Sequence, residues 1–495
     1  MTAYDSLLEL QKELKIWDTV SSVSFWDQLT VMPKDASPYR AEQNACLAKT
    51  KHRLQTSNEY EEQLFKAWTE VQASEGHSDR YIQVKRLKEE FERNRKLSTD
   101  LVSRLAKASV QGSAAWEEAK EAGDSSIFLR ELETLVDLAK EKADAYGFSD
   151  HPYDGLIGDF EQGMNTEDFD KLYTPLKDQL ADLVKEANED QGYRQLEGRF
   201  DLNIQDRLGK SLAEDLGFSF ANGAIMTSSH PFSITMGQND FRITTKYLEE
   251  DPFSAFYSTA HEVGHSLYER GLKKEYFGTP LGSSSTSGIH ESQSLFWENR
   301  VCRSPEFLDN WHSKFQESFP SMADWTRDEL KKTVNLAKPG YIRVEADETT
   351  YCLHIIIRFE IEKLLFSGSL KTNEVEEAWN ESYKKYLGLD VTDPRLGCLQ
   401  DVHWSEGLFG YFPSYALGHI LSAQFSESME KDLGSLDDRI AAQDYKSILM
   451  WLKGKIHHQG QRFYAKDLIK DISGSPLSSK PFVDYLKRKR SRIQG

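Results

Sequence analysis

Apolar side chains recur at three- and four-residue intervals along most of the chain, which predicts a mainly helical protein. Near the N-terminus the apolar positions with this spacing are Leu7, Leu10, Leu14 and Trp17. A second long helix is predicted over residues 78–110, because Ser78 can cap it and apolar residues then mark one broad face. Helices are therefore expected to form most of the core.

The segment 166–187 has the same helical spacing and contains a proline. Thr166 stands where an N-cap belongs, so the helix is expected to begin at this residue. Pro175 lacks the N–H that a helix interior needs. We therefore expect Pro175 to kink this helix or to divide it.

Strand character is confined to residues 221–247, where a period of two replaces the helical spacing. The positions on one face are Phe241, Ile243, Thr245 and Tyr247. A well-bounded helix follows, because Asp251 can cap it, Pro252 suits its first turn and Gly271 can close it. The predicted fold is mainly α, a large helical protein with a small β-sheet beside this helix.

Length and composition favour one large domain. The chain has 495 residues, of which 39% are hydrophobic and 28% are charged. Gly, Pro and Ser nowhere form a stretch long enough to separate domains. We therefore expect a single domain over residues 1–495, either undivided or built from two helical lobes that flank a cleft.

The net charge of −19 argues against binding to nucleic acids or to anionic membranes. The most apolar window, residues 351–366, contains charged residues and suits a core helix instead of a membrane span. The first residues lack the basic start and the apolar stretch of a secretory signal. The four cysteines are far apart and form no C-x-x-C pair, so reduced thiols in a cytoplasmic protein are expected.

The helix after the predicted strands contains the motif HEVGH at residues 261–265. Residues four apart on a helix are neighbours, so His261 and His265 can both reach one ion at about 2.0–2.1 Å. Glu262 is rotated by roughly 100° around the helix, which suits a base for the attacking water. This spacing predicts a metallopeptidase site, and the alternative is a surface helix with two solvated histidines.

A catalytic zinc site needs a third protein ligand. The pattern H-E-x-x-H-x-x-G-x-x-H is absent, so this ligand must come from another segment. Residues 287–301 are predicted to form a helix that places Glu291 and Glu298 on one face, with His290 as a weaker candidate. The spacing does not decide between the two glutamates.

Several long segments beyond the metal motif are distinctive. They are FWDQLTVMP (25–33), PYDGLIGDFEQGM (152–164), SSHPFS (228–233), DFRIT (240–244), HESQ (290–293), IRVEAD (342–347), GCLQDVHW (397–404) and GYFPSYALG (410–418). In this order, and over nearly the whole chain, they resemble the thermostable, Taq-type metallocarboxypeptidases.

This resemblance implies a helical peptidase with a substrate cleft that removes C-terminal residues with broad specificity, generally as a homodimer. It implies zinc as the metal ion, with cobalt as a substitute in some members. By position, His261, His265 and Glu291 match the metal ligands of the family, and Glu262 matches its catalytic base.

A carboxypeptidase needs a cation for the free C-terminal carboxylate, and the planar fork of an arginine matches that group. Arg343 is the best candidate, and the resemblance points to the same residue. The structural alternative is an ion pair with Asp347. Tyr411 and Tyr415 can donate hydroxyl hydrogen bonds to the oxyanion or to the peptide terminus, or they can simply belong to the core.

Two further candidates for substrate binding lie near the predicted strands. His230 precedes a proline and can donate to a substrate oxygen, or it is an ordinary loop residue. Arg242 and Thr244 can line the substrate groove through β-strand addition. The alternative is that Arg242 and Asp240 only fix the sheet.

Asp401 and His403 are expected to orient a metal ligand or a substrate-binding residue, or else to form a buried structural pair. Taken together, the residues predict a zinc-dependent metallocarboxypeptidase that hydrolyses the C-terminal bond of peptides. One alternative is a metal-dependent oligoendopeptidase on a similar helical fold. The other is a non-catalytic helical scaffold with a structural metal.

Overall fold

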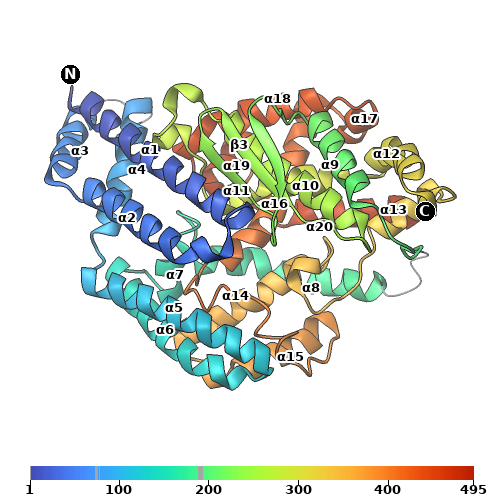
Figure 1. The fold of residues 1–495 in the computed structure, drawn as a ribbon, viewed down its shortest axis with the longest axis horizontal. Coiled ribbons are helices and arrows are strands. Elements are labelled where there is room, and N and C mark those ends of the chain that lie inside the picture. Colours follow the sequence, from blue (N-terminus) through green and yellow to red (C-terminus); the bar gives the residue numbers. More distant parts are fainter. Residues whose placement is uncertain (1, 73–75, 77, 188–192, 495) are drawn as a thin grey trace.

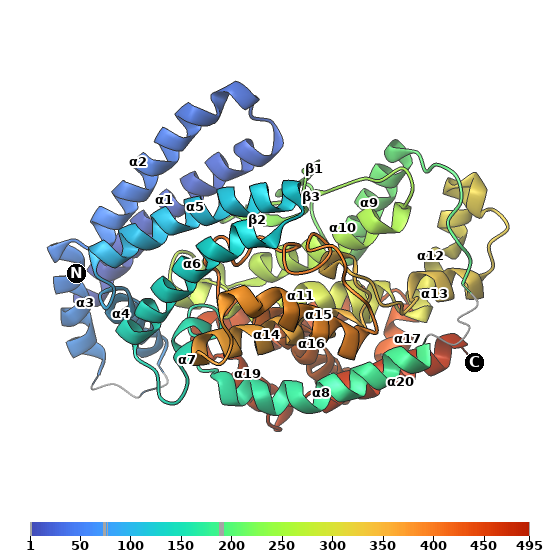
Figure 2. The same cartoon turned by 90° about the horizontal axis from the view of Figure 1, so that it is seen from below.

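The computed structural model describes residues 2–72, 76, 78–187 and 193–494, and it is mainly helical (Figures 1 and 2). The helices are α1 (Ala3–Thr30), α2 (Ser37–Gln55), α3 (Asn58–Val71), α4 (Asp79–Asn94), α5 (Thr99–Ala122), α6 (Ser125–Tyr146), α7 (Pro152–Ile157), α8 (Thr166–Ala187), α9 (Leu202–Leu216), α10 (Pro252–Gly271), α11 (Ser287–Leu295), α12 (Pro305–Ser318), α13 (Arg327–Val334), α14 (Tyr351–Ser367), α15 (Val375–Leu387), α16 (Phe412–Leu433), α17 (Leu436–Ala441), α18 (Tyr445–Lys455), α19 (Ala465–Ser473) and α20 (Lys480–Gln494). The predicted fold class is confirmed.

The small sheet consists of β1 (Gly223–Thr227), β2 (Ser233–Gly237) and β3 (Asp240–Thr245) in the order β1-β3-β2. β3 pairs in parallel with β1 and antiparallel with β2, and Ile243 is in register with both neighbours. Because both edges of β3 are occupied, a peptide cannot add to the strand that carries Arg242 and Thr244. The expectation of strand addition at these two residues is therefore wrong.

Two sets of buried apolar residues stabilise the chain. The larger set includes residues of α5 to α20 and surrounds the helices α10, α11, α14 and α16. The smaller set joins α1, α3 and α4 through residues such as Leu7, Leu64 and Leu87. α1 also contacts the sheet, because the rings of Trp26 and Phe232 meet edge to face at 5.7 Å.

The helix predicted over residues 78–110 is divided in the structure. Ser78 does cap α4, since its side chain accepts a hydrogen bond from the Tyr81 N–H. α4 ends at Asn94, however, and Ser98 caps α5 by accepting from the Leu101 N–H at 3.1 Å. A second capping serine inside the apolar pattern therefore separates two helices that the periodicity alone joined.

The helix that contains Pro175 is α8, and it is not divided. Its cap is Asn165, whose side-chain oxygen accepts from the Asp168 N–H at 2.9 Å, so the expected cap at Thr166 is wrong by one residue. The apolar face of α8, with Phe169 and Leu176 fully buried, stabilises the helix. This burial offsets a proline cost of roughly 3 kcal/mol.

The apolar window at residues 351–366 forms most of α14, which is buried as the sequence predicted. In the part of the chain that the structure describes, no helix has both the length and the apolar character needed to cross a membrane. All four cysteines are free thiols, and Cys46 alone is exposed.

Candidate metal centre

The helix that carries the HEVGH motif has the predicted boundaries. The Asp251 side chain caps α10 by accepting from the N–H groups of Phe253 and Ser254 at 2.9 and 3.2 Å. Gly271 is the last residue of the helix, but a left-handed turn is not the reason for a glycine there. A Cβ atom at this position would lie 2.0 Å from Nδ1 of His457, so the glycine permits a close approach.

Two other glycines bring α11 close to α10 on one side and to α16 on the other. A Cβ atom on Gly264 would lie 2.6 Å from Cα of Ser294, and one on Gly418 would lie 2.6 Å from Cγ of Glu291. α11 is therefore held between two helices at near-backbone contact. This packing places Glu291 directly over the two motif histidines.

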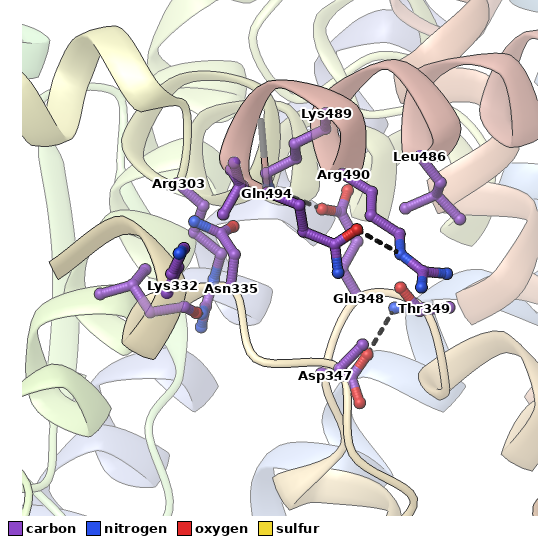
Figure 3. Close-up of a pocket in the computed structure, with 13 residues that line it drawn as sticks. Arg303, Lys332, Asn335, Asp347, Glu348, Thr349, Leu486, Lys489, Arg490 and Gln494 are labelled. Carbon is purple, nitrogen blue, oxygen red and sulfur yellow. Dashed lines mark hydrogen bonds and ion pairs between the residues drawn. The ribbon is translucent and has the colours of Figure 1, made fainter. Parts of the chain in front are cut away.

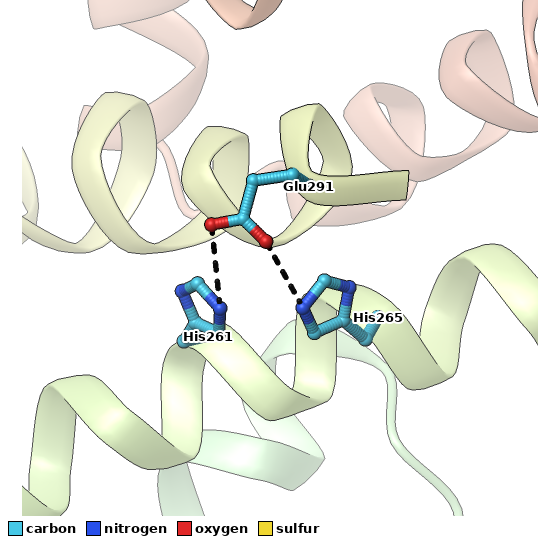
Figure 4. Close-up of side chains that lie close together, drawn as sticks. All are labelled: His261, His265 and Glu291. Atoms are coloured by element: carbon cyan, nitrogen blue, oxygen red, sulfur yellow. Dashed lines mark ion pairs between the residues drawn. The ribbon is translucent and has the colours of Figure 1, made fainter. Parts of the chain in front are cut away.

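His261, His265 and Glu291 converge on one point (Figure 4). The Nε2 atoms of the histidines lie 3.9 and 3.6 Å from the two carboxylate oxygens of Glu291, and all the ligand atoms lie within 4.8 Å of one another. Tetrahedral bonds of 2.0–2.2 Å separate ligand atoms by about 3.3–3.6 Å. These three side chains therefore fit a divalent cation such as zinc.

Glu298 contacts the opposite nitrogen of His261. It lies in a π-helical segment, Phe296–Cys302, that continues from α11, and its carboxylate oxygen is 2.9 Å from His261 Nδ1. Burial alone would raise the pKa of Glu298, but the hydrogen bond from His261 and the charge of Arg303 lower it to about 2. An ionised carboxylate in this position fixes the ring and leaves Nε2 free to bind a metal.

Arg303 holds Glu298 in place and also lines a cavity on the far side. Its Nε and Nη2 atoms donate to Glu298 at 3.2 and 3.1 Å, and its Nη1 atom donates to the Val334 carbonyl at 3.0 Å. The cavity lies between α13, α20 and the loop that contains Asp347 and Glu348 (Figure 3). A continuous set of hydrogen bonds thus runs from this cavity through Arg303 and Glu298 to His261.

Glu262 and His290 also lie beside the cluster. Glu262 is 7% exposed, and burial raises its pKa to about 7. The ring of His290 stacks on that of His265 at 4.5 Å, and its Nε2 atom is 3.1 Å from Glu269. Because this nitrogen already has a carboxylate partner, His290 is not placed as a metal ligand.

Arg343 is buried and held by two side chains. Its Nε and Nη2 atoms pair with Asp401 at 2.9 and 2.8 Å, and its Nη1 atom donates to the Tyr351 hydroxyl at 2.8 Å. Asp401 also pairs with Arg358 at 2.6 Å. The structural alternative, an ion pair between Arg343 and Asp347, is wrong. The Asp347 carboxylate instead accepts hydrogen bonds from neighbouring backbone N–H groups. Asp401 therefore fixes the guanidinium of Arg343, which agrees with either of the two roles that the sequence left open.

The predicted tyrosines lie next to Arg343. The rings of Tyr411 and Tyr415 meet at 5.0 Å, and the Tyr415 ring is 5.2 Å from the Arg343 guanidinium carbon. His403 Nε2 lies 3.3 Å from the Tyr415 hydroxyl. Burial raises the pKa of both Tyr411 and Tyr415, so both hydroxyls stay protonated near neutral pH. These tyrosines are available as donors beside the metal cluster.

The matches to known proteins extend over the same length as this fold. A family model described as the carboxypeptidase Taq (M32) metallopeptidases matches residues 6–490. The chain belongs to this family. It is therefore a metallocarboxypeptidase, and the predicted resemblance is confirmed.

Full-length relatives of this metallocarboxypeptidase are known from bacteria. Thermostable carboxypeptidase 1 of Thermus thermophilus is 36% identical and covers 100% of this chain and 99% of its own length. Carboxypeptidase 1 of Bacillus subtilis is 35% identical, covering 98% of this chain and 97% of its own. The crystal structure of the M32 carboxypeptidase from Deinococcus radiodurans superposes with a TM-score of 0.95 at 32% identity, covering 100% of this chain and 99% of that one.

Two predicted site residues of this metallocarboxypeptidase lie apart from the cluster. His230 is exposed in the turn between β1 and β2. Arg242 pairs with Asp240 at 2.8 Å and lies 5.5 Å from the Trp26 ring, which agrees with the structural alternative. Among the described residues, neither side chain forms a hydrogen bond or an ion pair with His261, His265 or Glu291.

The roles of Glu298 and Arg303 were not predicted from the sequence. The sequence indicates Glu298 only as a candidate metal ligand, and nothing in it marks Arg303. The seven-residue spacing to Glu291 did place Glu298 on the correct face. The spacing did not predict the π-helical segment that carries Glu298. In this segment the Glu298 carboxylate meets His261 at Nδ1 and not at Nε2.

Proposed function

We propose that this metallocarboxypeptidase uses zinc to hydrolyse the C-terminal peptide bond of peptides with broad specificity. The observation that carries the proposal is the position of a buried, oriented arginine beside a two-histidine, one-glutamate cluster. Arg343 packs against Tyr415 of α16 at 5.2 Å, and Gly418 one turn along the same helix lies against Glu291, so the cation and the proposed metal ligands lie on neighbouring elements. An arginine beside a metal cluster can bind a terminal carboxylate while the metal binds the adjacent peptide bond.

His261, His265 and Glu291 are assigned as the ligands, with zinc as the ion and cobalt as a substitute. Zinc, when bound, polarises a carbonyl group and acidifies water. The ligand set leaves a coordination position open, as catalytic sites require. The free thiols support a cytoplasmic location. The family resemblance supports a homodimer.

The chain's own residues then have distinct tasks. Glu262, whose pKa burial raises to about 7, takes a proton from the attacking water and returns it to the leaving amine. Arg343, oriented by Asp401, receives the terminal carboxylate of the peptide. Tyr411 and Tyr415 are assigned as hydroxyl donors to the developing oxyanion or to the terminus.

A peptide and its C-terminally amidated twin test this function directly. We expect the free peptide to be shortened from its C-terminus, and the amidated twin to be cut at least about 100-fold more slowly, because it lacks the charge that Arg343 binds. Removal of the metal should abolish both reactions, and zinc should restore them. Equal cleavage of both peptides, or internal cleavage, would favour the oligoendopeptidase instead.

The substitution Glu298→Gln tests whether Glu298 holds His261 in place for metal binding, separately from the hydrolysis step. We expect zinc affinity to fall by about 10- to 100-fold, because the amide is neutral and leaves Arg303 without its ion pair. Competition with a chelating dye measures this affinity, and kcat is compared at saturating zinc.

The matched control for this change is Glu427→Gln on α16. Its carboxylate is 53% exposed and forms only a surface pair with Lys431, so zinc affinity should stay at the wild-type value. Equal affinity in Glu298→Gln and in this control would show that Glu298 does not support the metal site.

A further inference from the structure

A second cavity lies at the C-terminal end of α10 and adjoins the metal cluster. Its volume is about 260 Å³, and it is bordered by α1, β2, the end of α10 and residues 282–284. Two of its lining residues, Glu269 and His290, form a hydrogen-bonded pair. The ring of His290 stacks on His265 at 4.5 Å, so one wall of the cavity is in contact with a metal-binding side chain.

The side chains that line this cavity carry a net positive charge, whereas the whole protein is negatively charged. The chain carries a net charge of −19, yet four cations line the cavity: Lys15, Arg270, Lys273 and Lys274. The single acidic residue among the lining residues is Glu269, which already pairs with His290. A cleft lined by cations concentrates anions near it.

None of these four cations forms an ion pair within the described ranges. Arg270 donates to the Gly217 carbonyl at 2.7 Å, and Lys274 donates to the Asn239 side chain at 2.8 Å. The ammonium groups of Lys15 and Lys273 lie 5.6 and 5.8 Å from the aromatic rings of Phe277 and Tyr276. Lys15 and Lys273 lie near enough to the carboxylates of Glu269 and Asp79, respectively, to help lower the pKa of each. Neither lysine forms a direct ion pair with them, so the four cations outnumber the one carboxylate that lines the cavity.

We propose that this cavity is a subsite for an acidic side chain of the substrate, upstream of the scissile bond. The inference rests on the proposed function, in which Arg343 binds the terminal carboxylate. Arg343 does not line the cavity, so the last residue of the peptide is bound elsewhere. The peptide segment that reaches the cavity is therefore the part that remains after cleavage.

The position of the acidic residue follows from the distance along α10. Glu269 is one helical turn beyond His265, which corresponds to about 6 Å. An extended peptide advances roughly 3.3–3.6 Å per residue, so two residues span about 7 Å. In the proposed function the metal site faces the carbonyl of the penultimate residue, and two residues upstream of it is the fourth residue from the C-terminus. The fourth residue is thus the one expected to place its side chain in the cavity.

The test compares N-terminally blocked peptides that have a free C-terminus and carry either Glu or Gln at one position. The pair is placed at the penultimate, third and fourth residues from the C-terminus in turn. Glu and Gln have the same shape, so the ratio of their kcat/KM values isolates the charge. We expect wild-type enzyme to prefer Glu by about fivefold or more at the fourth residue, and expect this ratio to fall as salt is added.

Lys15→Met and Lys273→Met remove charge while keeping the apolar stems of the side chains. Each should bring the Glu-to-Gln ratio toward one and leave kcat/KM for the Gln peptide near the wild-type value. Lys446→Met is the matched control, because Lys446 is exposed on α18 and does not line the cavity. This control should keep the wild-type ratio.

The outcomes separate this inference from the proposed function. A ratio near one at all three positions in wild-type enzyme, or a preference that survives both lysine substitutions, overturns the subsite. In either case, faster cleavage of free than of amidated peptides would still support the carboxypeptidase. The salt dependence of the wild-type ratio gives an answer even where a lysine variant fails to fold.

Discussion

Glu262→Gln is expected to lower kcat by roughly 10³- to 10⁴-fold on a peptide with a free C-terminus. Glutamine has nearly the same shape as glutamate but cannot accept the proton of the attacking water. The side chain is buried next to His261, and burial already raises the pKa of the carboxyl to about 7, so a neutral amide is tolerated there. We therefore expect the fold and the zinc content to remain at wild-type values while turnover is lost.

Three measurements on purified protein check this expectation: kcat, zinc content and the unfolding temperature. The exposed Glu427→Gln variant again serves as the control and should keep full activity. Retention of more than about a tenth of the wild-type kcat by Glu262→Gln would exclude it as the general base. Loss of zinc together with activity would instead indicate a structural role at the metal centre.

Arg343→Ala is expected to reduce kcat/KM for free peptides by about 10²- to 10³-fold, while the slow cleavage of the amidated twin changes little. The reason is that only the free peptide presents a carboxylate to the guanidinium. Arg343→Lys should restore little of the loss. A lysine cannot reproduce the fork that bonds Asp401 and Tyr351 while also facing the substrate.

The ratio between the free and amidated peptides is the decisive measurement for Arg343. An equal loss on both peptides would mean that the residue only maintains the structure around Asp401 and Arg358. The control is Arg395→Ala, which removes an arginine that is 51% exposed and paired with Asp393 at the surface. That variant should leave both rates unchanged.

The features that the sequence predicted well depend on neighbours along the chain. The cap at Asp251, the spacing of His261 and His265 and the helical character of α14 all follow from residues within two or three turns. Spacing alone did not choose Glu291 over Glu298; the resemblance made that choice. In the structure, Glu291 converges on Nε2 of both histidines, whereas Glu298 bonds Nδ1 of His261.

The features that the sequence did not predict depend on distant segments or on competition between nearby signals. Asp401 is 58 residues from Arg343, and nothing along the chain marks it as the partner in place of Asp347. Asn165 and Thr166 are both good caps, and reciprocal hydrogen bonds select the first: Asn165 accepts from the Asp168 N–H, and the Asp168 carboxylate accepts from the Asn165 N–H. The central place of β3 likewise results from a parallel pairing with β1.

The close packing at Gly264 and Gly418 links metal binding to the stability of the whole protein. Glu291 lies on a helix fixed between two others, so the cation would be bound by side chains that only the folded chain brings together. A ligand that binds the folded state alone adds about 2.7 kcal/mol to the unfolding free energy at a concentration 100 times its Kd. A bound metal ion would then protect this enzyme against heat and proteases as well as support its activity.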